Sequence, residues 1–212
     1  MERFSLQTVK KLLNGRTLPV LGLGTYRVAR EAVRASLDRG YRLIDTASCY
    51  DNEEEVGQEV KKSGIPREEI FVVTKVGYGL CGSLSDAFTR RREVNQIEIH
   101  PFLAWDECVS YCEEEGIAVM AYSPLTKGRK LRDPSLCKIA EKYGKTAAQV
   151  MIRWSLQRGF ICIPKSSSGE RIAENANIFD FDISDQDMKI LNGLDEHLIT
   201  DWPGIMNTPW EP

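Results

Sequence analysis

Residues 40–57 (GYRLIDTASCYDNEEEVG) constrain the fold more than any other stretch of this 212-residue chain. The stretch begins with apolar residues typical of a buried strand, and Asp45 ends that strand. Residues 52–60 then take on helical character, with Asp51 or Asn52 at the N-cap position. A strand that leads through a polar loop into a helix is typical of parallel barrels, which present their chemistry at the carboxyl ends of the strands.

A cluster of charged groups is expected at that edge. Residues 70–74 (IFVVT) predict a second buried strand, and Lys75 follows it directly. We expect Asp45, Tyr50 and Lys75 to converge, because neighbouring parallel strands end at the same edge. An ammonium beside a phenol lowers the pKa of the phenol, which would make Tyr50 a usable proton donor near neutral pH. The structural alternative, in which Asp45 caps the loop and Tyr50 is packed, stays open.

Strands alternate with helices along most of the chain, and this alternation predicts a parallel α/β fold. An Asn14-Gly15 pair between two partly apolar runs predicts an antiparallel hairpin within residues 1–18. The expected core strands are six in number, at residues 20–24, 42–46, 70–74, 94–99, 117–122 and 160–164.

Composition excludes several classes of protein. A formal net charge of -3 argues against a general surface for nucleic acid or for an anionic membrane. No apolar run approaches the ~20 residues that span a bilayer, and the first residues lack the apolar core of a signal peptide, so we expect a cytoplasmic protein. Cys108 and Cys112 lie four positions apart, but zinc needs four converging ligands, so no metal site is predicted.

Three motifs carry a resemblance to a known family. Residues 40–57, the Thr74-Lys75 pair and residues 163–175 (IPKSSSGERIAEN) resemble the signatures of the aldo-keto reductase superfamily in order and spacing. The resemblance covers the chain up to Lys75 and again from Val94 to the end. It implies one TIM-barrel domain over residues 1–212 that uses NADP to reduce carbonyl substrates, aldehydes or ketones, to alcohols. It also implies that Asp45, Tyr50 and Lys75 are catalytic.

The chain is too short for the complete barrel of that family. Such a barrel has eight strands and typically ~250 residues. Only nineteen residues (76–94) separate Lys75 from Asn95, whereas one strand–helix–strand passage needs ~30. We therefore expect an incomplete barrel of about six core strands, with a shortened junction at 76–93 and a C-terminal loop at 194–212. The two strands on either side of the shortened junction, at residues 70–74 and 94–99, either pair directly or leave exposed edges, through which the protein would self-associate.

The same shortening affects the catalytic set. In the family a catalytic His follows the fourth strand, inside the interval that is missing here, together with a Ser-Asn pair that holds the nicotinamide amide. His100 and His197 are the two histidines of this chain. By resemblance, the Asn95-Gln96 pair identifies the segment around His100 as the sixth strand of the family's eight-stranded barrel. We therefore expect a structural role for His100. Activity weakened by loss of the His, or an NADP-binding protein without turnover, are the two functional expectations.

The resemblance also implies the residues around the cofactor and the substrate. Two cations and a hydroxyl near a helix N-terminus suit the 2′-phosphate of NADP, although solvent-facing cations are the plain alternative. Tyr26, Trp202 and Trp210 are expected to form an apolar substrate wall. The expected cofactor contacts are Gly24, Thr25, Gln96, Tyr122, Ser123, Leu125, Lys165, Ser166, Arg171, Glu174 and Asn175.

Overall fold

Six parallel strands form the centre of the computed structural model, which describes residues 4–28, 30–75 and 93–200. They form two sheets of three strands, in the orders β3–β4–β5 and β6–β7–β8. Their bounds are Leu23–Gly24 (β3), Leu43–Asp45 (β4), Phe71–Val73 (β5), Val94–Glu98 (β6), Ala118–Tyr122 (β7) and Ile161–Cys162 (β8). Each predicted core strand is therefore present, although β3 and β8 are only two residues long.

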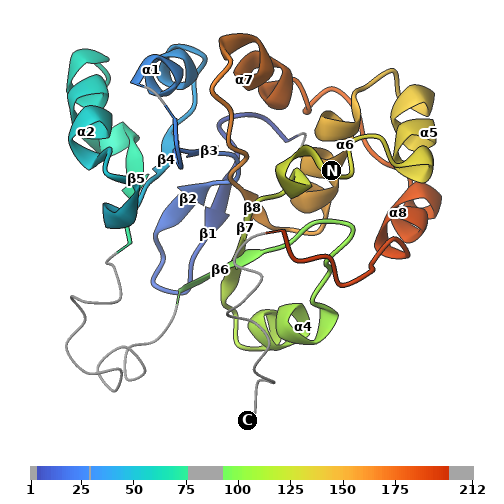
Figure 1. Ribbon diagram of the computed structural model, residues 1–212. Helices are drawn as coiled ribbons and strands as arrows, with labels where there is room; N and C mark the ends of the chain where they lie inside the picture. Colours follow the sequence, from blue (N-terminus) through green and yellow to red (C-terminus); the bar gives the residue numbers. More distant parts are fainter. Residues whose placement is uncertain (1–3, 29, 76–92, 201–212) are drawn as a thin grey trace.

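The two sheets meet at a seam between β3 and β8. Isolated parallel bridges join Leu21 to Cys162 and Gly24 to Lys165 across this seam. The backbones are close there, because a Cβ added to Gly24 would lie 3.0 Å from the carbonyl oxygen of Ile163. Figure 1 shows the resulting curve of strands from β5 through the seam to β6.

The curve does not close through the described residues. No backbone hydrogen bond joins β5 to β6 within 30–75 and 93–200, although these two strands would have to meet to complete a six-stranded ring. The prediction of an incomplete barrel is confirmed. Residues 76–92 of the expected junction and 201–212 of the expected C-terminal loop lie outside the described residues.

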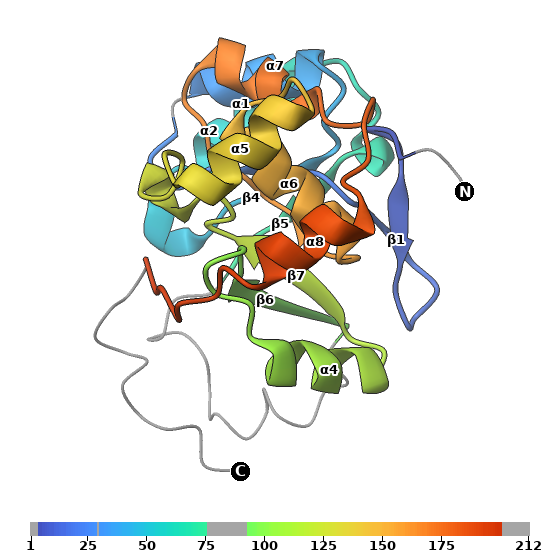
Figure 2. The same ribbon diagram turned by 90° about the vertical axis from the view of Figure 1, so that its right-hand side faces the viewer.

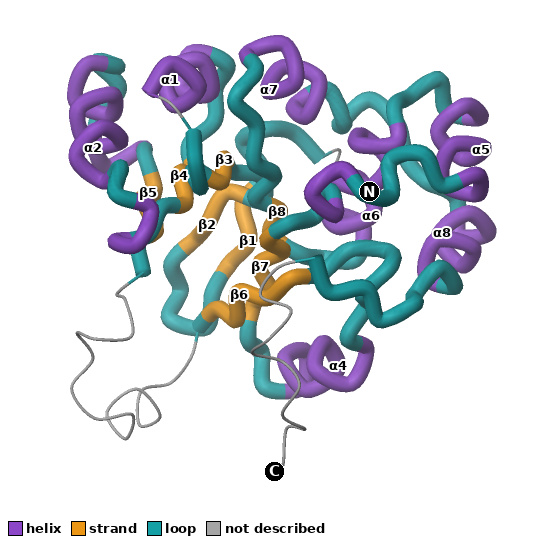
Figure 3. The backbone as a smooth tube through the Cα atoms, viewed as in Figure 1, coloured by secondary structure: helices purple, strands orange, loops and turns teal. Residues whose placement is uncertain are grey.

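The predicted N-terminal hairpin is also present. Strands β1 (Val9–Lys11) and β2 (Thr17–Pro19) pair antiparallel. Leu12 and Leu18 of this hairpin pack against inward-facing residues of the parallel strands, among them Met120. The hairpin lies inside the curve of strands in Figure 3. It packs on residues at the starts of the strands, among them Leu43 and Ala118, and so covers the end opposite to the charged residues.

Helices lie outside the curve of strands, as Figures 1 and 2 show together. Some of them begin at a side-chain cap: Asp133 accepts the N–H groups of Ser135 and Leu136, and Thr146 forms a capping box with Gln149. None of the described helices combines the length and the apolar character needed to cross a membrane. Their bounds are Arg30–Asp38 (α1), Glu53–Lys62 (α2), Asp106–Glu114 (α4), Pro134–Lys142 (α5), Ala147–Gln157 (α6), Gly169–Ala176 (α7) and Asp185–Asn192 (α8).

Two apolar cores lie between the strands and the helices. Val33 and Leu37 of α1 pack with Ile44 of β4 in one core. Trp154 of α6 packs with residues of α4, α5 and β7 in the other, and its side chain is fully buried. The first core also contains Cys162 of β8 and Ile152 of α6, so it crosses the seam and holds the two sheets together. The candidate site lies at the carboxyl ends of the strands.

Candidate active site

Asp45 and Lys75 form an ion pair at the carboxyl ends of β4 and β5. The two strands are in parallel register with Asp45 beside Val73, so the chain reaches Lys75 two residues past the pair. The Lys75 Nζ lies 2.5 Å from Asp45 Oδ1 and donates a second hydrogen bond of 3.0 Å to the carbonyl oxygen of Thr46. Neighbouring strands thus bring the carboxylate and the ammonium together, as the sequence predicts.

Asp45 lies in the interior, with only 3% of its side chain exposed. Burial raises the pKa of Asp45 above its ordinary value, because a carboxylate loses solvation there. The ammonium of Lys75 and the amide of Gln96 each oppose that rise. The ionised form of Asp45 therefore depends on these two partners.

Tyr50 lies over the ammonium of Lys75. It ends a short 3-10 turn, Ser48–Tyr50 (η1), which is held in place because Ser48 donates its N–H and its hydroxyl to the carbonyl oxygen of Lys75, each at 3.0 Å. The Lys75 Nζ lies 5.3 Å from the centroid of the Tyr50 ring, within the range of a cation–π contact. Asp45 and Tyr50 therefore both contact the ammonium of Lys75, and the three residues converge as predicted.

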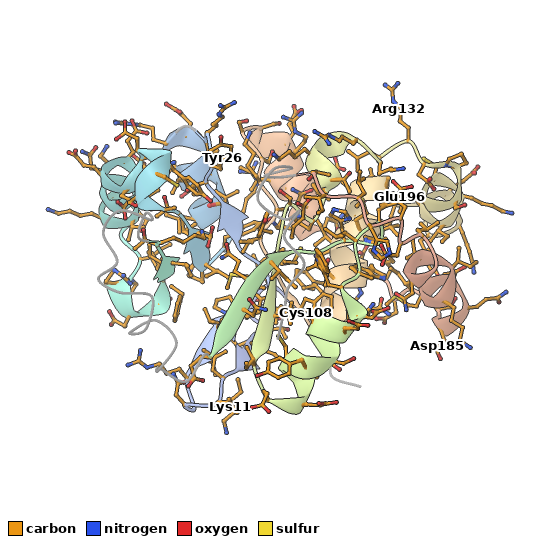
Figure 4. All side chains as sticks on the ribbon, turned by 60° about the horizontal axis from the view of Figure 1, so that its bottom comes forward. Lys11, Tyr26, Cys108, Arg132, Asp185 and Glu196 are labelled. Atoms are coloured by element: carbon orange, nitrogen blue, oxygen red, sulfur yellow. The ribbon has the colours of Figure 1, made fainter. Side chains whose placement is uncertain are left out.

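Tyr26, an expected member of the substrate wall, is next to this cluster. Its ring centroid lies 5.1 Å from that of Tyr50, and 44% of the residue is exposed. Figure 4 shows Tyr26 and Lys11 at opposite ends of the molecule, so the cluster lies far from the hairpin. The other expected wall residues, Trp202 and Trp210, lie outside the described residues.

Asn52 supports the site in a way the sequence did not predict. As an N-cap its side chain would bond the first turn of α2, but it makes no such bond. Its Nδ2 instead donates to the carbonyl oxygen of Thr25 at 2.8 Å, and its Oδ1 accepts from the Thr46 hydroxyl at 2.7 Å. Asn52 thus ties the loop after β3 to the loop after β4. Local sequence gave no signal for this role, because Thr25 lies 27 positions away.

The loop after β3 carries two of the expected cofactor residues. Thr25 is fully buried, and its hydroxyl donates to the carbonyl oxygen of Asp45 at 2.9 Å. Gly24 lies at the seam, beside Lys165. The structure therefore places this loop between the cluster of Asp45, Tyr50 and Lys75 and the chain after β8.

Gln96 reaches the cluster from the second sheet. Its Nε2 donates to Asp45 Oδ2 at 2.7 Å and lies 3.0 Å from the sulfur of Met120. Gln96 is in β6 and Asp45 is in β4, so this hydrogen bond joins the two sheets. The expected role of Gln96 was a contact to the cofactor, and the bond to Asp45 was not foreseen.

The chain after β7 carries three further expected cofactor residues. Tyr122 ends β7 beside Glu98, and the backbone of Ser123 is left-handed, with a φ of 46°. Leu125 is half-buried and packs against both apolar cores. These residues lie at the same edge of the sheets as Asp45, because β7 runs parallel to its neighbours.

Exposed cations lie at the start of α7. Ser168 caps this helix by accepting the N–H of Arg171. Lys165 and Arg171 are exposed, and neither forms an ion pair with any described residue. Ser166 is buried, and its hydroxyl bonds the backbone of Ser168. Two unneutralised cations near a helix N-terminus fit a phosphate group, so the residues present are compatible with NADP.

Glu174 and Asn175, further along α7, contribute to packing. The Glu174 carboxylate accepts a hydrogen bond of 2.6 Å from the hydroxyl of Thr146, which caps α6. Asn175 is buried. Both lie on the expected helix, and Glu174 also holds α7 against α6.

His100 lies in the interior next to Glu98. It is fully buried, and its Nε2 lies 3.3 Å from Glu98 Oε1. Glu98 also accepts hydrogen bonds from the N–H and the hydroxyl of Thr200. A buried imidazole held by a carboxylate fits the structural role expected for His100. The described residues contain no group of three or more His, Cys, Asp or Glu side chains arranged to hold a metal ion.

Comparisons with known proteins identify the family of the chain. The model of the aldo/keto reductase family matches residues 21–93 and 89–196. Glyoxal reductase of Bacillus subtilis is 34% identical, over 91% of this chain and 94% of that protein, and an aldo-keto reductase of Mycolicibacterium smegmatis is 35% identical, over 87% and 92%. The first of these alignments runs over 260 residues, more than the 212 of this chain, so the relatives are longer.

Solved structures show the same relationship. The crystal structure of MGS-M4, an aldo-keto reductase from a deep-sea metagenome library, superposes with a TM-score of 0.85 at 30% identity, covering 90% of this chain and 96% of that one. An aldo/keto reductase from Brucella melitensis superposes with a TM-score of 0.82 at 31% identity, covering 89% and 99%.

Proposed function

This chain belongs to the aldo-keto reductase family, and we propose that it reduces aldehydes or ketones to alcohols with NADPH as the hydride donor. Membership of the family supports an oxidoreductase that acts on carbonyl compounds. The choice of NADPH over NADH, and the roles of individual residues, are part of the proposal.

The position of Lys75 carries the proposal. Its ammonium contacts the Asp45 carboxylate at 2.5 Å on one side and the Tyr50 ring at 5.3 Å on the other. Asp45 orients this ammonium, and the ammonium favours ionisation of the phenol after a proton has left it. The arrangement suits proton donation by the Tyr50 hydroxyl to a carbonyl oxygen.

When bound, the reduced nicotinamide supplies a hydride to the carbonyl carbon. Tyr50 gives its proton to the carbonyl oxygen, and Lys75 stabilises the phenolate that remains. Tyr26 would form part of the apolar wall of the substrate pocket, together with Trp202 and Trp210. Gly24, Thr25, Gln96, Tyr122, Ser123 and Leu125 would line the cofactor between the cluster and α7.

The proposed activity is weak by the standard of complete barrels. A hydrogen-bond donor to a developing oxyanion is worth ~10²–10³ in rate, and we infer that this chain lacks the family's catalytic His. We therefore expect turnover to rest on Tyr50 and Lys75.

The test is aldehyde-dependent consumption of NADPH by the wild type and by Tyr50→Phe. The variant keeps the ring over Lys75 and loses only the proton donor, so its rate should fall by ~10² or more. Tyr111→Phe is the matched control, because Tyr111 is exposed on α4 and away from the cluster. Equal rates for the wild type and Tyr50→Phe would refute the proposal, and so would no rate in either.

The exposed cations of α7 favour a second candidate, an NADP-binding protein without turnover. Lys165 and Arg171 would hold the 2′-phosphate, with Ser166, Glu174 and Asn175 on the same segment. NADPH should then quench the protein fluorescence, and Arg171→Ala should weaken the binding of NADPH much more than that of NADH. Quenching without carbonyl-dependent turnover would select this candidate.

A further inference from the structure

The hydrogen bond between Gln96 and Asp45 joins residues of different sheets. Asp45 lies in β4 and Gln96 lies in β6, 51 positions later in the chain. The described residues of β5 and β6 share no backbone hydrogen bond, so on this side of the curve the side chains make the connection. The contact is short, at 2.7 Å, and one partner is almost fully buried.

Chemistry fixes the orientation of the Gln96 amide. An ionised carboxylate only accepts hydrogen bonds, so the nitrogen of the amide has to face Asp45 and the oxygen has to point elsewhere. The oxygens of Asp45 are then divided between two donors, with Lys75 on Oδ1 and Gln96 on Oδ2. This division fixes the plane of the carboxylate with respect to the Lys75 ammonium.

We propose that Gln96 is a positioning residue of the catalytic cluster, which holds Asp45 in the orientation that places Lys75 under Tyr50. This inference rests on the proposed reductase function and assigns Gln96 a role in addition to its expected contact with the cofactor. Because the amide oxygen of Gln96 accepts no hydrogen bond from a described residue, the same side chain can bind a nicotinamide carboxamide N–H. Gln96 would then connect the occupied cofactor site to the catalytic carboxylate.

The first experiment follows the titration of Asp45 by carbon NMR of its labelled carboxyl group, assigned with Asp45→Asn. Gln96→Met keeps the length of the side chain and removes the donor, so the titration of Asp45 should move to higher pH. Asn95→Ala is the matched control, since Asn95 is on the same strand and its amide contacts Cys108 and Cys112 beneath α4. An unchanged titration in Gln96→Met, or an equal shift in Asn95→Ala, would overturn the inference.

The second experiment uses turnover. Gln96→Met should lower kcat by on the order of 10-fold to 100-fold, because a small misplacement of a catalytic group has that effect. Gln96→Glu places two carboxylates together, and the pair shares a proton as the pH falls. The protonated Glu then donates to Asp45, so the kcat of Gln96→Glu should recover toward that of the wild type at lower pH.

No such recovery would occur if Gln96 only contacted the cofactor. A Gln96→Glu variant whose kcat stays low throughout the pH range would therefore count against the inference. The NMR arm needs no turnover, so it still decides the role of Gln96 if the wild type proves to be inactive.

Discussion

The two halves of the molecule differ in where their buried polar groups lie. The first half is residues 20–75, with β3–β4–β5, and the second half is residues 93–200, with β6–β7–β8. In the first half, the buried polar residues other than Ser36 of α1 and Glu59 of α2 lie at the carboxyl ends of the strands; they are Thr25, Asp45, Thr46 and Asn52. They bond to one another's loops and to Lys75. Most of the buried polar groups in this half therefore surround the cluster of Asp45, Tyr50 and Lys75.

In the second half, many of the buried polar groups lie in the helical layer. Arg153 of α6 bonds Asp182 and the carbonyl oxygen of Ile178, and the Nε1 of Trp154 donates to Asn192 at 2.7 Å. Asp187 of α8 bonds residues of α5 and of the loop before α8. Substitutions in the second-half helices should therefore change mainly stability, whereas substitutions at the first-half strand ends should change both stability and turnover.

The largest expected effect is that of Trp154→Ala. Truncation of a fully buried Trp leaves a cavity and also removes the shorter of the two hydrogen bonds to Asn192, so the free energy of unfolding should fall by ~3–5 kcal/mol. Denaturant unfolding measures this. Tyr111→Ala, at an exposed aromatic residue of α4, should change it by less than ~0.5 kcal/mol. A loss below ~1 kcal/mol for Trp154→Ala would show that the second-half core is loosely packed.

The pH dependence of stability should come partly from Asp187. Lys142 at 2.6 Å, Tyr143 at 2.5 Å and Ser184 at 2.8 Å donate to this carboxylate and lower its pKa to about 2. A depressed pKa means that the stabilisation is complete above the ordinary value near 3.8 and is lost as the pH falls toward about 2.

Asp187→Asn tests this directly. Hydrogen bonds to a charged group are worth ~1.5–3 kcal/mol, so the variant should lose about that much stability at neutral pH. Its unfolding free energy should then fall less steeply than that of the wild type between pH 4 and pH 2. Parallel curves for the two proteins in urea would contradict the assignment.

Asn52→Ala tests whether the loss of a buried polar residue in the first half lowers both stability and turnover. It leaves the buried hydroxyl of Thr46 without its acceptor and removes one of the two hydrogen bonds to the carbonyl oxygen of Thr25, which keeps the N–H of Val28; the loss costs ~1–3 kcal/mol. Because both loops carry the site, the rate of carbonyl reduction should fall as well. Gln58→Ala, at a half-buried position on the same helix, should leave the rate unchanged. If folded Asn52→Ala reduced carbonyls at the wild-type rate, the buried polar residues of the first half would not be needed for turnover.

The smallest expected effect is that of Asp133→Ala in the second half. The variant removes the side chain that accepts two N–H groups at the start of α5, which should cost ~1 kcal/mol with no change in rate for the folded protein. Ser135→Ala, at an exposed position of the same turn, is the control. Thermal unfolding and turnover measured on one preparation would check both statements.

Local sequence was sufficient for the parts of the molecule that depend on short motifs. The alternation of strands and helices predicted all six core strands, and the residues at strand ends predicted the convergence of Asp45, Tyr50 and Lys75. Caps such as Thr146 were also visible, because cap and helix are adjacent in the chain.

Contacts between distant segments were not predictable in this way. Asn52, one of the two residues expected at the N-cap position of α2, does stand there, but its side chain makes no cap bond and instead donates to Thr25, 27 positions away. The bond from Gln96 to Asp45 depends on how two sheets are placed, which strand propensity does not encode. Whether β5 meets β6 depends on the same placement, so the sequence left both outcomes open.

The bare backbone at Gly24 has a consequence for how the site tolerates change. A methyl group at this position would lie 3.0 Å from the carbonyl oxygen of Ile163, so it would act as a wedge between the two sheets. A main-chain atom cannot rotate away as a side chain can, so the two sheets would have to move apart. The absence of a side chain at Gly24 therefore helps to set the distance between the ammonium of Lys75 and the cations near the start of α7. Even the most conservative replacement, Gly24→Ala, would widen that spacing.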